Sequence, residues 1–386
     1  MEFLLTLTSF SIWLYLLFFY ANKKFSFQEL FWTNKVVFEN EFIKKQKQVD
    51  KLCIIIPARN EEQYIPETLR SISNLTYSKI SVLIIDDNST DDTVKISKNI
   101  LNKKKIQNFI VKGKKLPKGW SGKVWALKQG IDFLKKKKFS FYLFLDSDIK
   151  LEKNVVNEAV SYLRANNLVM VSMMAKLNCK NFWEKLLIPS FIYFFQKIYP
   201  FSRVNNPKDS LSAAAGGFIL CRANLFKNEN LYDFIKNKVI DDCNLAKIIK
   251  KKGNIWLGLT EKVYSQRNYN KISQIWLMVS RTAYEQLNFS LITLICSAFA
   301  MVLIYLYPIF SIIYFLKIDN NFLFFVSLFS TILMTISIIP TILFYKLNFL
   351  YFFSLPLSSI IYIMMTITSA LNFYFKKGNV WKGRKY

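Results

Sequence analysis

The chain has 386 residues, of which 52% are hydrophobic and 17% aromatic, and its formal net charge is +27. It contains no histidine, which excludes Ser-His-Asp triads, histidine-bound zinc and histidine general bases and leaves proton abstraction near neutral pH to Asp or Glu. The five cysteines form no CxxC pair, so we expect reduced thiols in a cytosol-facing protein.

The N-terminus carries an uncharged apolar run, Phe3–Tyr20, which is followed by Lys23 and Lys24. A cleaved signal peptide would have its positive charge before the apolar run. We therefore predict an uncleaved transmembrane anchor over residues 1–22, with the following chain in the cytoplasm according to the positive-inside rule. Residues 23–50 form a polar connector with a mostly helical pattern.

From residue 51 the pattern changes to short apolar strands that alternate with helices. The predicted strands are Leu52–Ile56, Ser81–Ile85 and Phe141–Leu145, and helical stretches such as Tyr64–Ile72 and Val124–Leu134 lie between them. Buried strands that alternate with helices indicate an α/β domain with a mostly parallel sheet, which we place at residues 51–287. Ligand-binding groups of such sheets collect at the carboxyl ends of the strands.

Three further apolar stretches follow, Phe289–Leu316, Phe322–Tyr345 and Phe349–Tyr374. Each is longer than the ~20 residues that a spanning helix needs, so we predict C-terminal transmembrane helices over residues 288–375. Three spans after a cytoplasmic domain would put the C-terminus outside, whereas the basic tail, residues 376–386, favours the inside. We give the count of spans more weight and expect the C-terminus outside.

Acidic side chains follow two of the predicted strands. Asp146-Ser147-Asp148 comes directly after one strand and Asp86–Asp92 after another. Two carboxylates one residue apart can hold a divalent cation, Mg²⁺ or Mn²⁺, that bridges to a diphosphate. Asn88, Ser89 or Thr90 could instead cap the helix that begins near Asp92.

A third cluster, Pro57–Glu62, lies where the first strand turns into a helix. Together Ile56–Glu61, Asp86–Asp92 and Asp146–Asp148 resemble, in order and spacing, the motifs of family 2 glycosyltransferases. The resemblance implies the GT-A fold, a nucleotide-sugar donor and a divalent metal. Several later segments are similar to signatures of the hopene-associated glycosyltransferases: Leu116–Ala126, Trp183–Pro189, Ala213–Gly217, Ile240–Cys243, Ile255–Leu259 and Arg281–Tyr284.

The resemblance also implies residue roles. The nucleotide-sugar-binding set is Pro57, Ala58, Arg59, Glu61, Asp86, Asp87, Lys123 and Asp146. Asp148 would be the main metal ligand, with Asp146 beside it. Gly216, Gly217 and Trp183 would lie on the acceptor side, and Arg281 would pair with the diphosphate, although Thr282 replaces the Trp that follows this Arg in the wider family. Arg59 and Lys123 could be solvated surface charges, and the two glycines could mark a turn that needs positive φ.

Asp241-Asp242 matches the family's Glu-Asp motif, with Asp242 as the catalytic base and inversion at the anomeric carbon. The alternative is that Asp242 caps the helix Cys243–Lys250. The apolar, aromatic segment Trp183–Phe201 is shorter than a span and contains Pro189, where we expect the helix to break. We predict that this segment docks the catalytic domain on the membrane, and a buried core helix is the alternative.

These observations predict a multi-pass enzyme of the cell (inner) membrane, with a cytoplasmic catalytic domain, that moves a sugar from a nucleotide donor to a hopanoid-related lipid. A polyprenyl phosphate or a carotenoid is the alternative acceptor. The lysine runs Lys103–Lys105, Lys135–Lys138 and Lys250–Lys252 are short and scattered at helix ends, which disfavours nucleic acid as a partner. A non-catalytic scaffold is disfavoured by the complete set of acidic motifs.

Overall fold

The computed structural model describes residues 1–20, 50–375, 380–381 and 384–385, and it divides into two compact units. The α/β unit contains the described residues from 50 to Asn178 and Arg203–Asn268, and the helical unit contains residues 1–20, Cys179–Ser202 and the chain from Tyr269 onward. The predicted domain 51–287 is thus shared between the two units. All but the last residue of the predicted connector, 23–50, lies outside the described residues.

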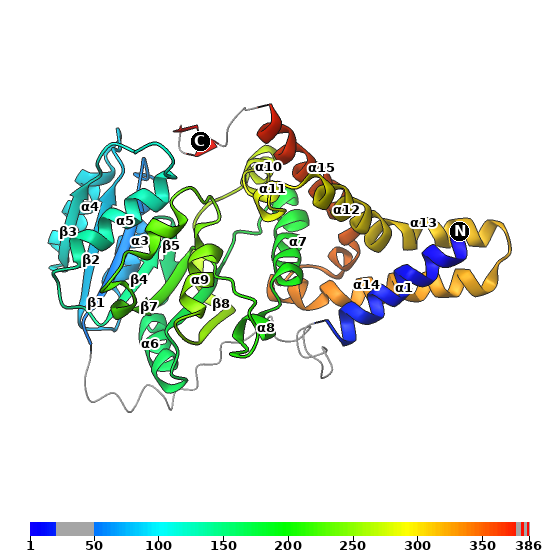
Figure 1. Ribbon diagram of the computed structural model, residues 1–386, viewed down its shortest axis with the longest axis horizontal. Coiled ribbons are helices and arrows are strands. Elements are labelled where there is room, and N and C mark those ends of the chain that lie inside the picture. The colour runs from blue at the N-terminus through cyan, green and yellow to red at the C-terminus, as the bar shows by residue number, and fades with distance from the viewer. Residues whose placement is uncertain (21–49, 376–379, 382–383, 386) are drawn as a thin grey trace. The chain divides into compact units, whose positions relative to one another are not determined.

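The α/β unit is built on an eight-stranded sheet of order β3-β2-β1-β4-β7-β6-β8-β5 (Figure 1). The strands are β1 Leu52–Ala58, β2 Ile80–Asp86, β3 Gln107–Lys112, β4 Phe141–Leu145, β5 Ile149–Leu151, β6 Met170–Lys176, β7 Phe218–Arg222 and β8 Ile255–Ser265. Strands β1 to β4 pair in parallel, as do β6 and β8, whereas β7 and β5 run antiparallel to their neighbours. The predicted strands and the mostly parallel sheet are confirmed.

The helices of this unit are α3 Ile65–Ser73, α4 Thr93–Lys103, α5 Gly122–Leu134, α6 Val155–Ala165 and α9 Asp241–Lys250, with 3-10 turns η3 Ala223–Phe226 and η4 Leu231–Ile235. A short helix, α8 Phe201–Asn205, lies at the boundary with the helical unit. The helices predicted at Tyr64–Ile72 and Val124–Leu134 are confirmed, with small shifts of their first residues.

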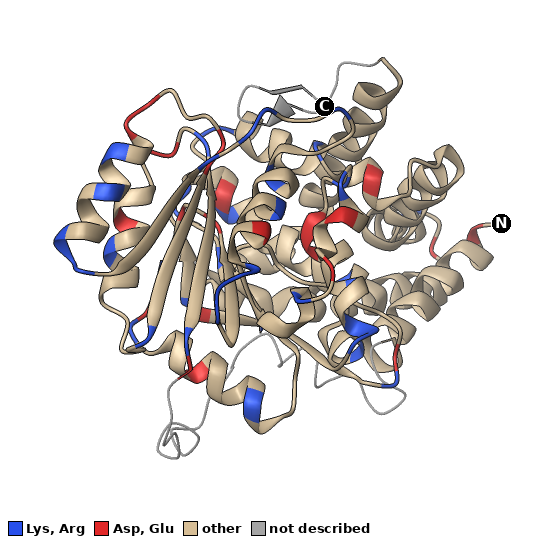
Figure 2. Ribbon diagram, turned by 60° about the vertical axis from the view of Figure 1, so that its left-hand side comes forward, with Lys and Arg blue, Asp and Glu red and all other residues tan. Residues whose placement is uncertain are grey.

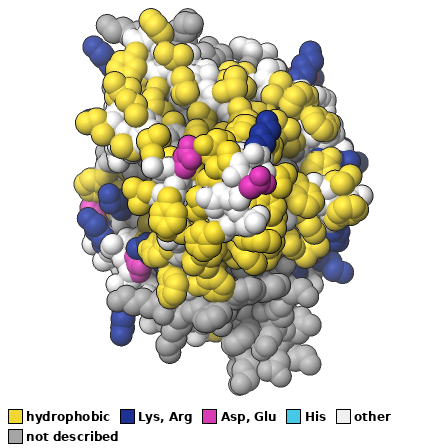
Figure 3. Space-filling view, turned by 90° about the vertical axis from the view of Figure 1, so that its right-hand side faces the viewer, with side chains coloured by type: hydrophobic (Ala, Val, Ile, Leu, Met, Phe, Trp, Pro, Cys, Tyr) yellow, Lys and Arg dark blue, Asp and Glu magenta, His cyan; other side chains and the backbone are white. Residues whose placement is uncertain are grey.

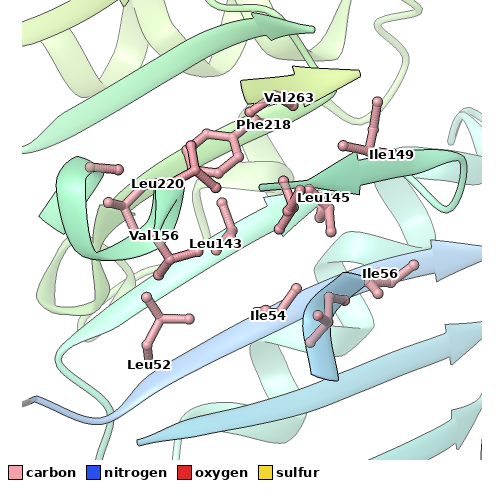
Figure 4. Close-up of a cluster of buried hydrophobic side chains, with 14 of the residues drawn as sticks. Leu52, Ile54, Ile56, Leu143, Leu145, Ile149, Val156, Phe218, Leu220 and Val263 are labelled. Atoms are coloured by element: carbon pink, nitrogen blue, oxygen red, sulfur yellow. The ribbon is translucent and has the colours of Figure 1, made fainter. Parts of the chain in front are cut away.

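The core of the α/β unit lies between the sheet and the helices that pack on it. Every residue of β1 is buried, as expected for a parallel strand whose two faces are both covered. Ile54 on β1, Leu143 on β4 and Leu220 on β7 point into one apolar cluster (Figure 4). This rigid support holds the ends of β1, β2 and β4, where the predicted motifs lie.

The helical unit consists of α1 Glu2–Phe18, α7 Phe182–Ile198, α10 Ile272–Ser280, α11 Ala283–Gln286, α12 Leu291–Met301, a π-helical turn Val302–Leu306, α13 Tyr307–Lys317, α14 Asn321–Phe344, a 3-10 turn Phe349–Phe353 and α15 Leu355–Tyr374. Three helical stretches are long and apolar enough to cross a membrane, Leu291–Lys317, Asn321–Phe344 and Leu355–Tyr374. Figure 3 shows the face over α1, α13 and α14, which is dominated by hydrophobic side chains.

Helix α1 is fixed to the π-helical turn by two hydrogen bonds. Pro308, just after this turn, has no N–H to donate to the carbonyls that precede it. Ser9 Oγ donates to the Leu303 carbonyl and Trp13 Nε1 to the Ile304 carbonyl, each at 2.9 Å. In an apolar surrounding a backbone carbonyl needs such a partner, so the two side chains of α1 stabilise the irregular turn.

The predicted break at Pro189 is wrong, because α7 continues through this residue to Ile198. Hydroxyl groups bond to the carbonyls just before it: Ser190 Oγ donates to Leu186 at 3.1 Å and Tyr362 Oη to Leu187 at 2.9 Å. The carbonyl that loses its backbone donor to Pro189 is that of Lys185, so these two bonds support the adjacent carbonyls of the same turn. Helix α7 packs on α14 and α15 and is part of the helical unit.

Candidate active site

The site is built at the carboxyl ends of β1, β2 and β4. Figure 2 marks the positions of acidic and basic residues along the ribbon. The loops after β1 and β2 are tied together. Arg59 Nη1 donates to the carbonyls of Asp87 at 2.6 Å and Asn88 at 3.2 Å, and the Asp87 N–H donates to Ala58 at 2.8 Å. Arg59 therefore stabilises the loop after β2 through hydrogen bonds and is not merely a solvated surface charge.

Asp86 and Asp87 are both buried at the end of β2. The Asp86 carboxylate accepts the Ser89 N–H at 3.0 Å, and its carbonyl accepts the Gly113 N–H at 2.7 Å. The predicted capping role of Asn88, Ser89 or Thr90 is wrong, because α4 begins at Thr93 and its N–H bonds to Asp91 Oδ1 at 3.1 Å. Asp86 and Asp87 thus take part in hydrogen bonds that hold the loops at the end of β2.

Lys123 links two of the acidic motifs. It lies in the first turn of α5, and its Nζ is 2.9 Å from Asp146 Oδ1 and 3.7 Å from Asp241 Oδ2. Asp242, the next residue on α9, accepts the Gly216 N–H at 2.8 Å. The structure thus brings Lys123, Asp146, Asp241, Asp242 and Gly216 together, and we call this group the lysine cluster.

A second cation holds the other carboxylate of the Asp146–Asp148 motif. Arg267, just past β8, places Nε 3.1 Å from Asp148 Oδ2 and Nη2 2.8 Å from Glu61 Oε1. Ser265 Oγ donates to the same Asp148 oxygen at 2.8 Å. We call Arg267, Asp148, Glu61 and Ser265 the arginine cluster, and the two clusters together the acidic edge.

Gly216 is required by close approach and not by backbone conformation. A Cβ at this position would lie 3.1 Å from Lys123 Nζ and 3.3 Å from Asp242 Oδ2. Its φ is not positive, and neither is that of Gly217, so the expectation of a positive-φ turn is wrong. The absence of a side chain lets the Gly216 N–H reach the Asp242 carboxylate.

The interpretation of Asp242 as the N-cap of the following helix is also wrong. The N-cap of α9 is Ile240, and Asp242 is the second helical residue, with Oδ1 accepting its neighbour's N–H at 2.8 Å. Burial and the adjacent Asp241 raise the pKa of Asp242 to about 6, against the lowering effect of Lys123. A carboxyl group with such a pKa is ionised at neutral pH yet basic enough to take a proton.

The charges of the acidic edge do not balance. Burial raises the pKa of Asp148 despite the Arg267 guanidinium. Burial alone would lower the pKa of Lys123, but Asp146 and then Asp241 outweigh it and raise that pKa above its usual range. The shift of the Lys123 pKa indicates surplus negative charge: in the described residues, the two clusters contain five carboxylates and two cations.

This surplus bears on a divalent metal. In the described part of the chain, no group of three or more His, Cys, Asp or Glu side chains is arranged to hold a metal ion by itself. Mg²⁺ often binds through one or two carboxylates together with substrate phosphates. Asp146 and Asp148 fit that mode, because an anionic diphosphate entering so acidic an edge needs added positive charge.

Sequence reasoning missed three members of the site. Arg267 and Ser265 lie about 120 residues beyond the carboxylate that they bind, and no local pattern connects them. Gly113 is missed as well, although a Cβ there would lie 2.9 Å from the Asp86 carbonyl. The only signal in the sequence was their position at or just after the end of a strand.

Two predicted site residues belong to the helical unit. Trp183 is on α7, with its ring 5.1 Å from that of Phe182, and Arg281 follows α10. Their predicted roles toward the acceptor and the diphosphate stay predictions.

Comparison with known proteins finds a family whose model matches part of the chain. Residues 53–229 match the family described as glycosyl transferase family 2. This segment is similar to family 2 glycosyltransferase domains. It contains the loops after β1, β2 and β4, together with Lys123 and Gly216, whereas Asp241, Asp242 and Arg267 follow it.

Relatives share this domain. An uncharacterised glycosyltransferase of Haemophilus influenzae is 30% identical over 31% of this chain and 44% of its own length. The 4,4'-diaponeurosporenoate glycosyltransferase of Staphylococcus haemolyticus is 29% identical over 32% of each chain. The chain therefore matches less than half the length of these two curated relatives.

A solved structure shares the fold of nearly the whole chain. The mannosyltransferase PcManGT of Pyrobaculum calidifontis, in complex with GDP-Man and Mn²⁺, is 12% identical, with a TM-score of 0.56 over 98% of this chain and 100% of its own. The predicted GT-A-type fold with additional apolar helices is thereby confirmed.

Proposed function

We propose that this protein is an inverting, membrane-bound glycosyltransferase that moves a sugar from a nucleotide-sugar donor to the hydroxyl or carboxyl group of an apolar lipid. The observation that carries the proposal is the acidic edge. Asp242, whose pKa is raised to about 6, lies next to Asp241, and Lys123 joins Asp241 to the Asp146–Asp148 motif of the segment that matches family 2.

In the proposed reaction, Asp86 and Asp87 bind the base or ribose of the donor. Lys123 lies beside the diphosphate and offsets its charge. Asp148 and Asp146 would hold a divalent cation, which when bound neutralises charge on the departing diphosphate. Removing a charge-stabilising group of this kind commonly costs several kcal/mol of barrier.

Asp242 accepts the proton of a hydroxyl acceptor, whereas a carboxyl acceptor is already ionised near neutral pH and has no proton to give up. The acceptor oxygen forms a bond to the anomeric carbon from the face opposite the diphosphate, the bond from that carbon to the diphosphate oxygen breaks, and the nucleoside diphosphate leaves. The Gly216 N–H, 2.8 Å from Asp242, holds the carboxylate in place. A single displacement of this geometry inverts the anomeric configuration.

The acceptor is proposed from the helical unit and from two resemblances. Three helices apolar enough to span a membrane favour an acceptor that resides in the bilayer. The signatures shared with hopene-associated glycosyltransferases favour a hopanoid-related lipid. The similarity to a 4,4'-diaponeurosporenoate glycosyltransferase favours a carotenoid acid as the second candidate. Both are apolar polyisoprenoid-derived lipids with one polar end.

The test uses the full chain in detergent with a panel of UDP- and GDP-sugars and a divalent metal. Hopanoid polyol and carotenoid acid are offered separately, with product mass and nucleoside diphosphate release as readouts. A glycosylated hopanoid formed by wild type and not by Asp242→Asn supports the proposal, as does a glycosylated carotenoid acid formed by wild type. Nucleoside diphosphate release that no lipid stimulates, with any donor, would refute lipid transfer.

A further inference from the structure

The helical unit contains a hairpin whose two arms define the direction of the membrane crossing. The arms are Leu291–Lys317 and Asn321–Phe344, and Ser311 Oγ donates to Ser327 Oγ across them at 2.9 Å. At 1.5 Å per residue each arm is about 35 to 40 Å long, which exceeds the ~30 Å hydrocarbon layer. The hairpin has a closed end at residues 318–320 and an open end where α12 begins and α14 ends.

Helix α1 runs beside this hairpin. The Phe3 ring is 6.4 Å from that of Phe322, and Tyr314 Oη donates to Glu2 Oε1 at 3.0 Å. The N-terminus is therefore near the closed end, and α1 runs parallel to α14 toward the open end. Figure 1 shows α1, α13 and α14 alongside one another, with α15 running across their direction.

Both ends of α15 lie at the open end of the hairpin. Its first residue, Leu355, is buried in one cluster with Ile338 and Ile342 from the last part of α14. At its other end, Tyr374 Oη is 2.8 Å from Tyr284 Oη, and the Phe373 ring is 4.7 Å from that of Phe289. Tyr284 and Phe289 immediately precede α12, so α15 connects the two open arms. A spanning helix would end on the order of 30 Å away, near the closed end.

The sequence of α15 agrees with this placement. Its mean hydropathy is 1.4, against 2.2 and 2.4 for the hairpin arms. One face packs on protein, where Ser190 Oγ donates to Ser358 Oγ at 2.9 Å. The exposed apolar side chains recur every three or four residues and so form one stripe along the helix: Leu357, Ile360, Met364, Ile367 and Leu371. A helix with one apolar exposed face can lie in the membrane plane.

The two ends of the hairpin also differ in their basic residues. The chain just beyond α1 carries Lys23 and Lys24, Lys346 follows α14, and the tail 376–386 is basic. The closed end carries Lys317 beside Asp319 and Glu2. By the positive-inside rule the open end faces the cytoplasm.

We propose that α15 lies along the cytoplasmic surface of the lipid bilayer, with its apolar stripe against the acyl chains, and that of the three long apolar helices only Leu291–Lys317 and α14 cross it. Among the described residues between 50 and 290 there is no candidate span, so the glycosyltransferase domain and the C-terminal tail share one side. This assignment removes the conflict between the number of apolar stretches and the basic tail, and it does not depend on which sugar or lipid the enzyme uses.

Labelling of single introduced cysteines tests the sidedness. Lys104→Cys on the surface of the α/β unit, Asn320→Cys at the closed end and Tyr386→Cys after α15 are made in the full chain. Right-side-out and inside-out vesicles are treated with a membrane-impermeant maleimide, and each site is read by peptide mass. We expect positions 104 and 386 to react in the same vesicles and 320 in the opposite ones. Reaction of 386 together with 320 would overturn the proposal.

Depth measurement provides an independent test. Nitroxides at Leu357, Met364 and Leu371 are spread over about 21 Å of helix axis. An in-plane helix gives three similar, shallow depths, as judged by collisions with oxygen and a polar nickel complex. Matched labels at Phe322, Ile332 and Leu343 on α14 should instead pass through the bilayer centre. A depth at Met364 about 10 Å greater than at Leu357 and Leu371 would show that α15 crosses and would refute the proposal.

Discussion

The acidic edge and the helical unit place their polar groups in opposite ways. At the acidic edge, carboxylates crowd together until burial and neighbouring charge raise the pKa of Asp242 and Asp148. In the helical unit, hydroxyl and indole groups are paired across helices, such as Tyr193 with Ser337 at 2.9 Å and Trp13 with the Ile304 carbonyl. The crowded carboxylates of the acidic edge repel one another, whereas the polar groups of the helical unit are satisfied by hydrogen bonds.

This difference separates activity from stability. Strained electrostatics are typical of functional sites, so substitutions at the acidic edge should abolish transfer with little loss of stability. Substitutions of the paired groups in the helical unit should lower stability and leave the chemistry intact. A variant that does the reverse would break the comparison.

The largest effect is expected from Asp242→Asn. Loss of a general base commonly costs 10²- to 10⁴-fold in rate, so kcat for lipid transfer should fall by about that factor while the donor Kd changes little. Asp233→Asn, on an exposed turn of the same unit, is the matched control. A collapse of donor affinity would instead make Asp242 a binding residue.

The same variant has a predicted stability change. A carboxyl group whose pKa is raised by folding stabilises the fold below its unfolded value, near 4, and loses that contribution as pH rises through about 6. At pH 8 the Asn variant should therefore melt at or above the wild-type temperature. A clearly lower melting temperature at pH 8 would contradict the electrostatic account of this residue.

The next largest effect is expected from Asp148→Ala. We expect at least an approximately hundredfold loss of transfer, because several kcal/mol of charge stabilisation on the diphosphate would be lost. Titration calorimetry should also show weaker metal binding in the presence of nucleoside diphosphate, whereas Asp233→Ala should bind as wild type does. Full wild-type activity in excess chelator would refute the metal role.

The acidic edge could be predicted from sequence to the extent that its chemistry is local. Asp86 ends β2, and Asp146 and Asp148 follow β4 within three residues, so their meeting at one edge follows from the parallel sheet. The pairing of Lys123 with Asp146 could not be derived, because it depends on how α5 packs. Arg267 was missed because β8 joins the sheet from far along the chain.

A smaller effect is expected from pH. If Asp242 is the base, kcat/KM should fall about tenfold per pH unit below about 6, since only the ionised form accepts a proton and kcat/KM reports the free enzyme. Gly216→Ala should shift this limb, because its Cβ would press on Asp242 and Lys123. Gly217→Ala is the control: its Cβ would meet apolar atoms of Ile149 and Ala175, and the limb should stay in place.

The helical unit was harder to predict, for a physical reason. Apolar runs such as Phe349–Tyr374 show that a segment avoids water, but hydropathy does not tell whether the helix crosses the membrane or lies in its plane. At one end of α15, Leu355 shares a buried cluster with Ile338, 17 residues earlier in the chain. At the other end, Tyr374 pairs with Tyr284, 90 residues earlier. The helix around Pro189 shows the same limit, since the hydroxyl group that bonds to the Leu187 carbonyl comes from Tyr362, 175 residues along the chain.

The smallest effect is expected from Trp13→Phe in the helical unit. The substitution keeps an aromatic ring in the buried position but leaves the Ile304 carbonyl without its indole donor, next to Pro308, which cannot donate. An unpaired buried carbonyl costs about 1 kcal/mol or somewhat more, which corresponds to a few degrees in the melting temperature measured in detergent. Tyr15→Phe, at an exposed position of the same helix, should leave the melting temperature unchanged. Donor hydrolysis measured below the melting transition should be the same in both variants, because neither substitution alters the acidic edge. A selective loss of hydrolysis in Trp13→Phe would show that the packing of α1 affects the catalytic site as well as stability.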